Sequence, residues 1–471
     1  MKLGNLKKWG TMMKLIMENI GKVSHASIDI NGITVVAGEN NLGKSTISKA
    51  LYSVVDGLSN YEDEIIAQRL QLVFQKIKES MRGIRIRRYS LFECIDAIEF
   101  KIGEELKINT NPRGRRIGKN RELVTVQDMS EVVKKFEEGG ELDEDDIELI
   151  FEKILNLLDE SRKIYISDDE ISFENIDIPE LLDNVNEIMS APKNKILMRL
   201  LSNHFNKEFQ NQVNNIYDKN LKAKVGLIVK DKSVNIDITE NKVTKISDNP
   251  ENLWVNVEYI DNPFILDDIP SRMIERNRYS LYHGTKLIYD LQKGISDNAI
   301  EGYILDEKFQ EIEDELLKIV KGNLKSADMH VGLSENDSDQ IIDMKNVSAG
   351  LKIFIIIKTL FENKSLEENG ILILDEPEIH LHPDWQVKLA KIIVLIQKIF
   401  KMHILLNTHS PYFINAIEVY SDLYNIENNF YLAEQTDKGT MFVNVNKNVD
   451  KIYKKMLKPF QDLENIDERE R

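Results

Sequence analysis

The sequence predicts an α/β fold, with a mixed β-sheet and helices, an antiparallel β-subdomain and a helical arm inserted into the chain. Three observations predict it. A glycine-rich segment at 38–46 lies between an apolar run and a helix-forming run. Two further apolar runs, at 371–374 and 404–406, end in charged or polar side chains. Lys44 and Asp375 are 331 residues apart, which is more chain than one compact nucleotide-binding domain needs between them.

The glycine-rich segment GENNLGKST fits the phosphate-binding pattern G-x-x-x-x-G-K-[ST]. The run at 33–37 predicts a buried strand before it, and the run at 47–55 predicts a helix after it. Backbone N–H groups of the turn would face phosphate oxygens, Lys44 would reach the β- and γ-phosphates, and Ser45 would bind Mg²⁺. The alternative is a chance match in a glycine turn, which the flanking elements disfavour. The expected nucleotide-binding residues are Gly38, Glu39, Asn40, Asn41, Leu42, Gly43, Lys44, Ser45 and Thr46.

The two downstream strands end in side chains that suit the same chemistry. Asp375 and Glu376 follow the first strand, where Asp375 would hold Mg²⁺ and Glu376 would polarise the attacking water. His409 follows the second strand and would contact the γ-phosphate. A carboxylate pair or a lone histidine after a strand is by itself more often structural. In combination with the phosphate-binding loop, these residues predict an ATP-hydrolysing site with Lys44, Glu376 and His409 as catalytic residues.

As a set, these motifs resemble the ABC superfamily of ATPases, in its SMC, RecF and OLD-like branch. The N-terminal pattern runs from Met13 to Thr46, so we expect residues 1–12 to be an extension or to precede the native start. DEPEIHLHPDWQ, at 375–386, resembles a Walker B motif and D-loop, and NTHSP, at 407–411, resembles a switch histidine. Ser348-Ala349-Gly350 with Lys352 resembles a shortened ABC signature, whereas a transporter would usually show Leu-Ser-Gly-Gly-Gln. Residues 60–330 share much less of the resemblance.

The resemblance implies a mechanism that needs two copies of the chain. In ABC-type ATPases the helix after the signature faces the nucleotide of the opposite protomer. Ser348 and Gly350 begin such a helix at 351–361, and a helix N-terminus favours anions. We therefore expect a head-to-tail homodimer with two composite ATP sites, or a higher oligomer built from it. ATP and Mg²⁺ are the expected cofactors.

Hydrophobic spacing predicts the domain organisation. Helices are expected at 62–79, 145–158, 180–188, 193–216 and 385–400. Alternating Val and Ile at 221–246 predict antiparallel strands, and 255–260 predicts a further core strand. The predicted divisions are an N-terminal ATPase lobe at 1–60, a helical arm at 61–220, strands that rejoin the lobe at 221–265, a helical segment at 266–330, a C-terminal ATPase lobe at 331–446 and a charged tail at 447–471.

Composition predicts a cytoplasmic protein with no membrane span. The 471 residues carry a formal net charge of −17, which argues against a protein that coats nucleic acid over its whole surface. One cysteine, Cys94, excludes an intrachain disulfide and suits a reducing compartment. The longest apolar runs are much shorter than the stretch that spans a bilayer.

Local charge clusters allow two interpretations each. Basic residues gather at Arg82–Arg88 and at Arg113–Arg121, where they would form a nucleic-acid or partner-binding patch or, more simply, a solvated loop. The acidic stretch at 137–148 is expected to be a solvated loop, with partner docking as the alternative. His380 and His382 would form part of the D-loop, which is favoured over a transition-metal site.

The resemblance extends to the stand-alone ATPase subunits of bacterial anti-phage defence systems, such as Septu and PARIS. After His409 there is no Asp-x-Asp pair, which the TOPRIM nuclease of OLD-like proteins requires, so no intrinsic nuclease is predicted. The expected function is a nucleotide-gated scaffold that senses phage infection and restrains or activates a separate effector, a nuclease or a toxin. The alternatives are a RecF-like or SMC-like DNA-repair ATPase that clamps DNA, a transporter ATPase, and a P-loop fold without active chemistry.

Overall fold

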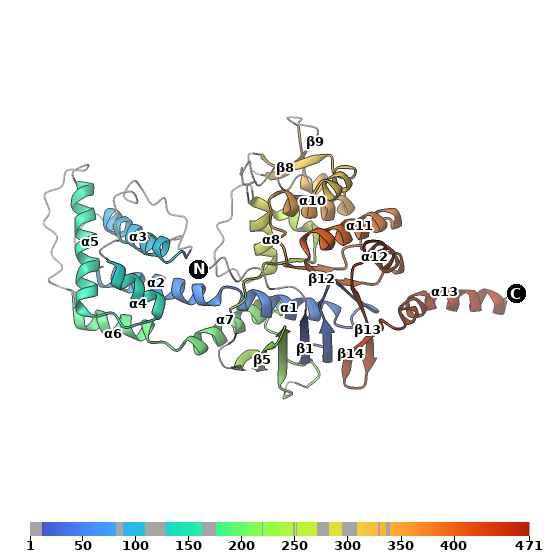
Figure 1. Cartoon of the computed structure of the whole chain (residues 1–471), viewed down its shortest axis with the longest axis horizontal. Helices are drawn as coiled ribbons and strands as arrows, with labels where there is room; N and C mark the ends of the chain where they lie inside the picture. The colour runs from blue at the N-terminus through green and yellow to red at the C-terminus, as the bar shows by residue number, and fades with distance from the viewer. Residues whose placement is uncertain are drawn as a thin grey trace. The chain divides into compact units, whose positions relative to one another are not determined.

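The chain forms two compact units. The computed structural model describes residues 12–81, 88–108, 129–162, 176–218, 220–247, 250, 252–270, 282–293, 309–327, 330–335 and 340–470. We call Met1–Ser59 with Met198–Arg471 the sheet unit, and Asn60–Leu197 the helical unit. Figure 1 shows both units and labels many of their helices and strands. The predicted arm, at 61–220, is longer than the helical unit, which ends at Leu197. Helix α7, Lys193–Glu208, begins in the helical unit and ends in the sheet unit.

The sheet unit is built on one mixed sheet of eleven strands among the described residues. Their order is β6-β5-β4-β1-β2-β14-β13-β3-β12-β11-β7. This sheet, its helices and its antiparallel part confirm the predicted fold class. The strands are β1 Met13–Ile20, β2 Val23–Asp29, β3 Ile33–Ala37, β4 Ala223–Val229, β5 Lys232–Thr239, β6 Lys242–Ile246, β7 Val257–Ile260, β11 Ile371–Asp375, β12 His403–Thr408, β13 Asn428–Thr436 and β14 Gly439–Asn444.

Five strands form a parallel core, β1, β2, β4, β5 and β6 form the antiparallel part, and β14 joins the two by pairing antiparallel with β13 and parallel with β2. Strands β13, β3, β12, β11 and β7 pair in parallel, and every residue of β3, β11, β12 and β7 is buried. Fully buried, continuous apolar strands are typical of a parallel sheet that is covered on both faces. The strands β4, β5 and β6 pair antiparallel beyond β1, and β5 alternates between buried and more exposed positions. The alternation predicted at 221–246 therefore reflects strands that pair with the first strand of the chain.

Helices cover the sheet, and two of them begin at a side-chain cap that is followed by proline. Helix α11 begins at Pro383, and its N-cap His382 accepts a hydrogen bond from the backbone N–H of Asp384. Ser410 caps α12 in the same way, also before a proline. The helices are α1 Lys44–Leu58, α8 His283–Gln292, α10 Ala349–Glu362, α11 Pro383–Phe400, α12 Pro411–Tyr424 and α13 Asp450–Glu470. A small antiparallel sheet contains β8 Gly322–Ala327, β9 His330–Glu335 and β10 Ile341–Asp343.

The helical unit has a hydrophobic core of its own. Buried apolar side chains from each of its helices meet there, including Phe74, Ile98, Phe136, Ile150 and Val185. The amphipathic spacing in the sequence predicted three of these helices, at 62–79, 145–158 and 180–188, whereas the helices at 88–105 and 130–138 were not among those expected. Its helices are α2 Tyr61–Ser80, α3 Arg88–Glu105, α4 Ser130–Glu138, α5 Glu144–Arg162 and α6 Ile178–Met189.

Some local expectations were wrong, and others fall outside the described residues. The acidic stretch at 137–148 is not one loop, because α5 begins at Glu144 with acidic side chains in its first turn, where the helix dipole favours them. Helix α7 ends at Glu208, before the expected end at 216. Within the expected helical segment at 266–330, β8 begins at Gly322. Residues 82–87 and the cluster at 113–121 lie outside the described part of the chain.

Among the described residues, the helices are too short or too polar to cross a lipid bilayer.

Candidate functional site

The candidate site lies where three adjoining parallel strands end. Strand β12 pairs with β3 on one side and with β11 on the other. Strand β3 leads into Gly38, β11 ends at Asp375, and β12 is followed by His409. Ligands of open parallel sheets bind at the carboxyl ends of the strands. The sheet therefore brings together three motifs that are far apart in the sequence.

The phosphate-binding loop is shaped by glycine and closed by a buried lysine. Gly43 has a positive φ of 76°, and a Cβ there would lie 3.1 Å from Val23 Cγ2. Lys44, at the start of α1, donates to the backbone carbonyls of Gly38 and Glu39, each at 3.0 Å. Its Nζ also lies 3.2 Å from Oε1 of Glu376. The buried cation is thus held at the centre of the loop, next to the carboxylate that follows β11.

Asp375 is buried among polar groups from three elements. Its Oδ2 accepts a 3.1 Å hydrogen bond from the Tyr259 hydroxyl, and its Oδ1 accepts one of 3.0 Å from the Asn407 amide. The Ser45 hydroxyl bonds to the same carboxylate. Burial raises the pKa of Asp375, and the hydrogen bonds from Asn407, Ser45 and Tyr259 oppose that rise.

The donor set around Asp375 fits Mg²⁺. Ser45 and Asp375 offer a hydroxyl and a carboxylate oxygen, the hard ligands that Mg²⁺ prefers. The buried Oδ1 of Asn407 has no hydrogen-bond partner among the described residues, although its amide nitrogen bonds to both Asp375 and Ser48. An orphaned oxygen at this point is able to accept from a metal-bound water.

Glu376 lies between Lys44 and His409. Nδ1 of His409 lies 3.6 Å from Oε1 of Glu376. The hydrogen bond from His409 outweighs burial and, with the charge of Lys44, lowers the pKa of Glu376 to about 2. Glu376 has a φ of 50°, a left-handed conformation that costs a non-glycine residue about 1–2 kcal/mol. Its backbone N–H donates to the Asn407 carbonyl at 2.9 Å, which holds this conformation.

The sequence interpretation missed Glu378 as a site residue. This carboxylate is buried, and it accepts from the Thr408 hydroxyl and, at 3.1 Å, from the backbone N–H of His409. Its Oε1 lies 3.8 Å from Nδ1 of His409. Glu378 therefore fixes the segment that carries His409. The available signal was a second glutamate two residues after Glu376.

Replacing Glu376 should lower the pKa of His409. The hydrogen bond that His409 donates to Glu376 is the largest cause of the shift and raises the pKa of His409; burial opposes the rise, and the charge of Glu378 adds to it. In Glu376→Gln that pKa should fall, and NMR titration of the imidazole would measure it. A histidine whose pKa is higher in the folded than in the unfolded protein stabilises the fold when it is protonated. In the wild type this stabilisation is fully present below pH 6.5, the pKa of unfolded histidine, and is lost as pH rises through the pKa of folded His409.

The matched control for this titration removes a carboxylate elsewhere in the sheet unit. Glu418 accepts a 3.1 Å hydrogen bond from the Tyr453 hydroxyl. Glu418→Gln should leave the titration of His409 unchanged. An unchanged pKa of His409 in Glu376→Gln would contradict the assigned pairing.

The shortened signature lies at the start of α10. Ser348 is the N-cap of this helix and is exposed, and its side chain makes no capping hydrogen bond. A Cβ on Gly350 would lie 2.9 Å from the backbone oxygen of His380, so the helix start packs against the segment after Glu376. Gly350 and Glu376 both line a small cavity of about 80 Å³ there. Lys352 is buried and donates to Asp267 at 2.6 Å.

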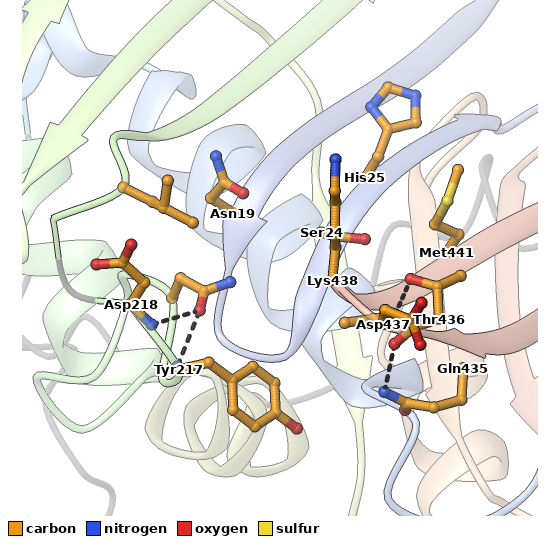
Figure 2. A pocket seen from close by; sticks show the side chains of 13 residues that line it. Asn19, Ser24, His25, Tyr217, Asp218, Gln435, Thr436, Asp437, Lys438 and Met441 are labelled. Carbon is orange, nitrogen blue, oxygen red and sulfur yellow. Dashed lines mark hydrogen bonds between the residues drawn. The ribbon is translucent and has the colours of Figure 1, made fainter.

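A larger cavity, of about 940 Å³, lies elsewhere in the sheet unit (Figure 2). Figure 2 shows Tyr217 and Asp218 on one side and Asp437 and Lys438 on the other. The cavity contains none of the predicted nucleotide-binding residues. It flanks the turn between β1 and β2, whose Lys22 bonds to Asn41 of the phosphate-binding loop.

The expected absence of a histidine metal site stays a prediction. His382 caps α11, and the ring of His380 packs edge-on against Phe264, with centroids 5.2 Å apart. The described residues contain no cluster of three or more His, Cys, Asp or Glu suited to a metal ion.

A known protein of similar sequence matches part of the chain. The Septu protein PtuA of Bacillus thuringiensis is 32% identical over 165 residues, which cover 28% of this chain and 41% of that protein. The chain therefore matches less than half of the length of this relative.

Two solved structures are similar at low identity. The SMC head bound to the C-winged helix domain of ScpA gives 12% identity and a TM-score of 0.37, covering 94% of this chain and all of that one. The SMC head domain from Thermotoga maritima gives 10% and 0.35, covering 93% and all of that one. The fold is assigned from the strand order and not from these scores.

A match to a protein family covers most of the chain. The family described as AAA ATPase domain (AAA_15) matches residues 12–414. The match includes the loop around Lys44, the carboxylates Asp375 and Glu376, and His409. The chain therefore belongs to the AAA ATPase domain family.

Proposed function

We propose that the chain is a cytoplasmic ATPase subunit of an anti-phage defence system, which uses ATP to control a separate effector. The observation that carries the ATPase proposal is the convergence of Lys44, Asp375, Glu376 and His409 at the ends of three parallel strands. The likeness to PtuA over 165 residues supports the defence role.

Each residue at the strand ends has a proposed role. Backbone N–H groups of residues 38–46 bind the phosphates, and Lys44 compensates their charge. Glu376 accepts a proton from the attacking water, and its lowered pKa keeps it ionised for this step. His409 orients Glu376 and contacts the γ-phosphate. Ser45 and Asp375 would hold Mg²⁺, which would neutralise charge on the phosphates.

A second copy of the chain completes each site in this proposal. Ser348 is exposed and leaves the N-terminus of α10 without a side-chain cap, so the first N–H groups of that helix are available to an anion. The γ-phosphate bound by one protomer would meet this helix of the other. Homodimers, or higher oligomers built from them, would then close on ATP and open after hydrolysis.

The effector is proposed to be a nuclease or a toxin encoded beside this chain, which the ATPase restrains or activates when infection is sensed. The test is co-expression with the neighbouring gene, followed by native mass measurement with and without ATP and Mg²⁺, and by phage challenge. A co-purifying neighbour and a phage-dependent phenotype would support the proposal. No stable partner and no phenotype would refute the effector role.

A DNA clamp is the alternative function. It draws on the basic clusters Arg82–Arg88 and Arg113–Arg121, which lie almost entirely outside the described residues. An ATP-dependent dimer that ignores the neighbouring protein but binds duplex DNA, with affinity that falls as salt rises, would favour this alternative.

A further inference from the structure

Helix α7 ends on a buried histidine of the sheet unit. Glu208, its last residue, is 1% exposed, and its Oε2 lies 2.7 Å from Nδ1 of His283. The other carboxylate oxygen, Oε1, accepts the backbone N–H of His283 at 2.8 Å. Two contacts between one carboxylate and one residue fix both the backbone and the ring at the start of α8.

The opposite side of the imidazole faces the end of β7. Nε2 of His283 lies 3.0 Å from Oδ1 of Asp261, which follows that strand directly. Burial alone lowers the pKa of His283, but the carboxylates of Asp261 and Glu208 overcome burial and raise it to about 9. The ring is therefore a cation at neutral pH, held between two carboxylates.

Two neighbours of the His283 ring, Tyr259 and Asp261, also belong to the surroundings of the nucleotide site. The Tyr259 ring packs on His283 with centroids 4.1 Å apart, and its hydroxyl donates to Asp375 at 3.1 Å. An aromatic ring packed on a cation is held by electrostatic attraction as well as by contact area. Asp261 lines the 80 Å³ cavity together with Gly350 and Glu376. One side chain thus contacts a partner of Asp375 and a wall of the cavity beside Glu376.

A second buried contact joins α7 to the helix that carries the phosphate-binding loop. Nδ1 of His204, one turn before Glu208, lies 3.3 Å from Oδ2 of Asp56 on α1. Helix α7 is therefore fixed at two points. His204 holds it to α1, which begins at Lys44, and Glu208 holds it to His283, which packs on the tyrosine bonded to Asp375. Its first residues, Lys193–Leu197, belong to the helical unit.

We propose that His283 is a positioning residue for the nucleotide site, which sets Tyr259 against Asp375 and Asp261 beside Glu376, and that Glu208 links this setting to α7. The proposal rests on the ATPase function proposed above. A displacement of α7 would act on hydrolysis through the Glu208–His283 contact, without any contact between the helical unit and ATP. The competing explanation is that His283 only stabilises the fold.

The test compares wild type, His283→Gln and Glu208→Gln in ATP turnover, Mg²⁺ dependence and nucleotide affinity. His283→Gln cannot bridge two carboxylates as a cation, so kcat should fall about tenfold or more, the range typical for a residue behind a metal ligand. The Mg²⁺ concentration for half-maximal ATP binding should rise, while ATP binding without Mg²⁺ stays close to wild type because the phosphate-binding loop is intact. Glu208→Gln keeps an acceptor for the backbone N–H and should have a smaller effect of the same kind.

Ser202→Ala is the matched control, because the Ser202 hydroxyl accepts a 2.9 Å hydrogen bond from the backbone N–H of Val243 on β6. It weakens another anchor of α7 and should leave kcat and Mg²⁺ dependence unchanged. A folded His283→Gln with wild-type kcat and Mg²⁺ dependence would overturn the proposal, and if that variant does not fold, the same result in Glu208→Gln would. A wild type that binds ATP without hydrolysing it would refute the proposed ATPase function, whereas the Mg²⁺ dependence of ATP binding would still decide the role of His283.

Discussion

Glu376→Gln should bind ATP but hydrolyse it about 10²- to 10⁴-fold more slowly than the wild type, which is the range expected when a general base is lost. The amide has nearly the same shape as the carboxylate but cannot accept the proton of the attacking water. Lys44 keeps its hydrogen bonds to the carbonyls of Gly38 and Glu39, so the phosphate-binding loop should stay closed around the ligand. Phosphate release under saturating ATP and Mg²⁺ measures the loss.

Glu376→Gln also tests whether the chain dimerises when ATP is bound. If hydrolysis opens the proposed composite sites, Glu376→Gln should accumulate as an ATP-bound dimer in light scattering, while the wild type returns to its resting state. Glu418→Gln, which removes a carboxylate from the contact with Tyr453, should behave as wild type. Turnover within a few-fold of wild type in Glu376→Gln would refute its assignment as the general base.

Lys44→Ala should lose most of the affinity for ATP. A hydrogen bond to a charged group contributes about 1.5–3 kcal/mol. At about 1.4 kcal/mol per tenfold change in affinity, the dissociation constant should rise about 10- to 100-fold. The substitution also leaves the carbonyls of Gly38 and Glu39 without their shared donor and removes the cation beside Glu376. Isothermal titration with a non-hydrolysable ATP analogue measures the change in affinity.

The control for Lys44→Ala is a lysine of the same unit outside the site. Lys398 on α11 pairs with Glu311 at 2.8 Å and lies over the Tyr424 ring. Lys398→Ala should keep wild-type affinity for ATP. Equal affinities of Lys44→Ala and wild type, at comparable thermal stability, would show that ATP does not bind at this loop.

Strands β3, β11 and β12 of the parallel core could be predicted from the sequence because their apolar runs are continuous and end in polar motifs, whereas β13 was not among the expected strands. Strands β3, β11 and β12 are buried along their whole length, so nothing interrupts the pattern. Lys44 and Glu376 meet at 3.2 Å, although the helical unit and much of the sheet unit separate them in the chain. This contact could be expected because both motifs serve ATP hydrolysis, not because of any local pattern in the sequence.

The supporting residues could not be predicted from the sequence. Tyr259 bonds to Asp375 across 116 positions, and Glu208 bonds to His283 across 75. A tyrosine in a strand or a glutamate at a helix end has many ordinary roles, and only the folded sheet selects the one observed. For the acidic stretch at 137–148 two expectations overlapped, a loop and the helix at 145–158, because acidic side chains suit a helix start as well as a loop.

The separate hydrophobic core of the helical unit has a thermodynamic consequence. Two units with their own cores can unfold as two cooperative transitions, so a single melting temperature would not describe this chain. The described residues of the candidate ATP site all belong to the sheet unit, so bound nucleotide would shift the transition of that unit by mass action.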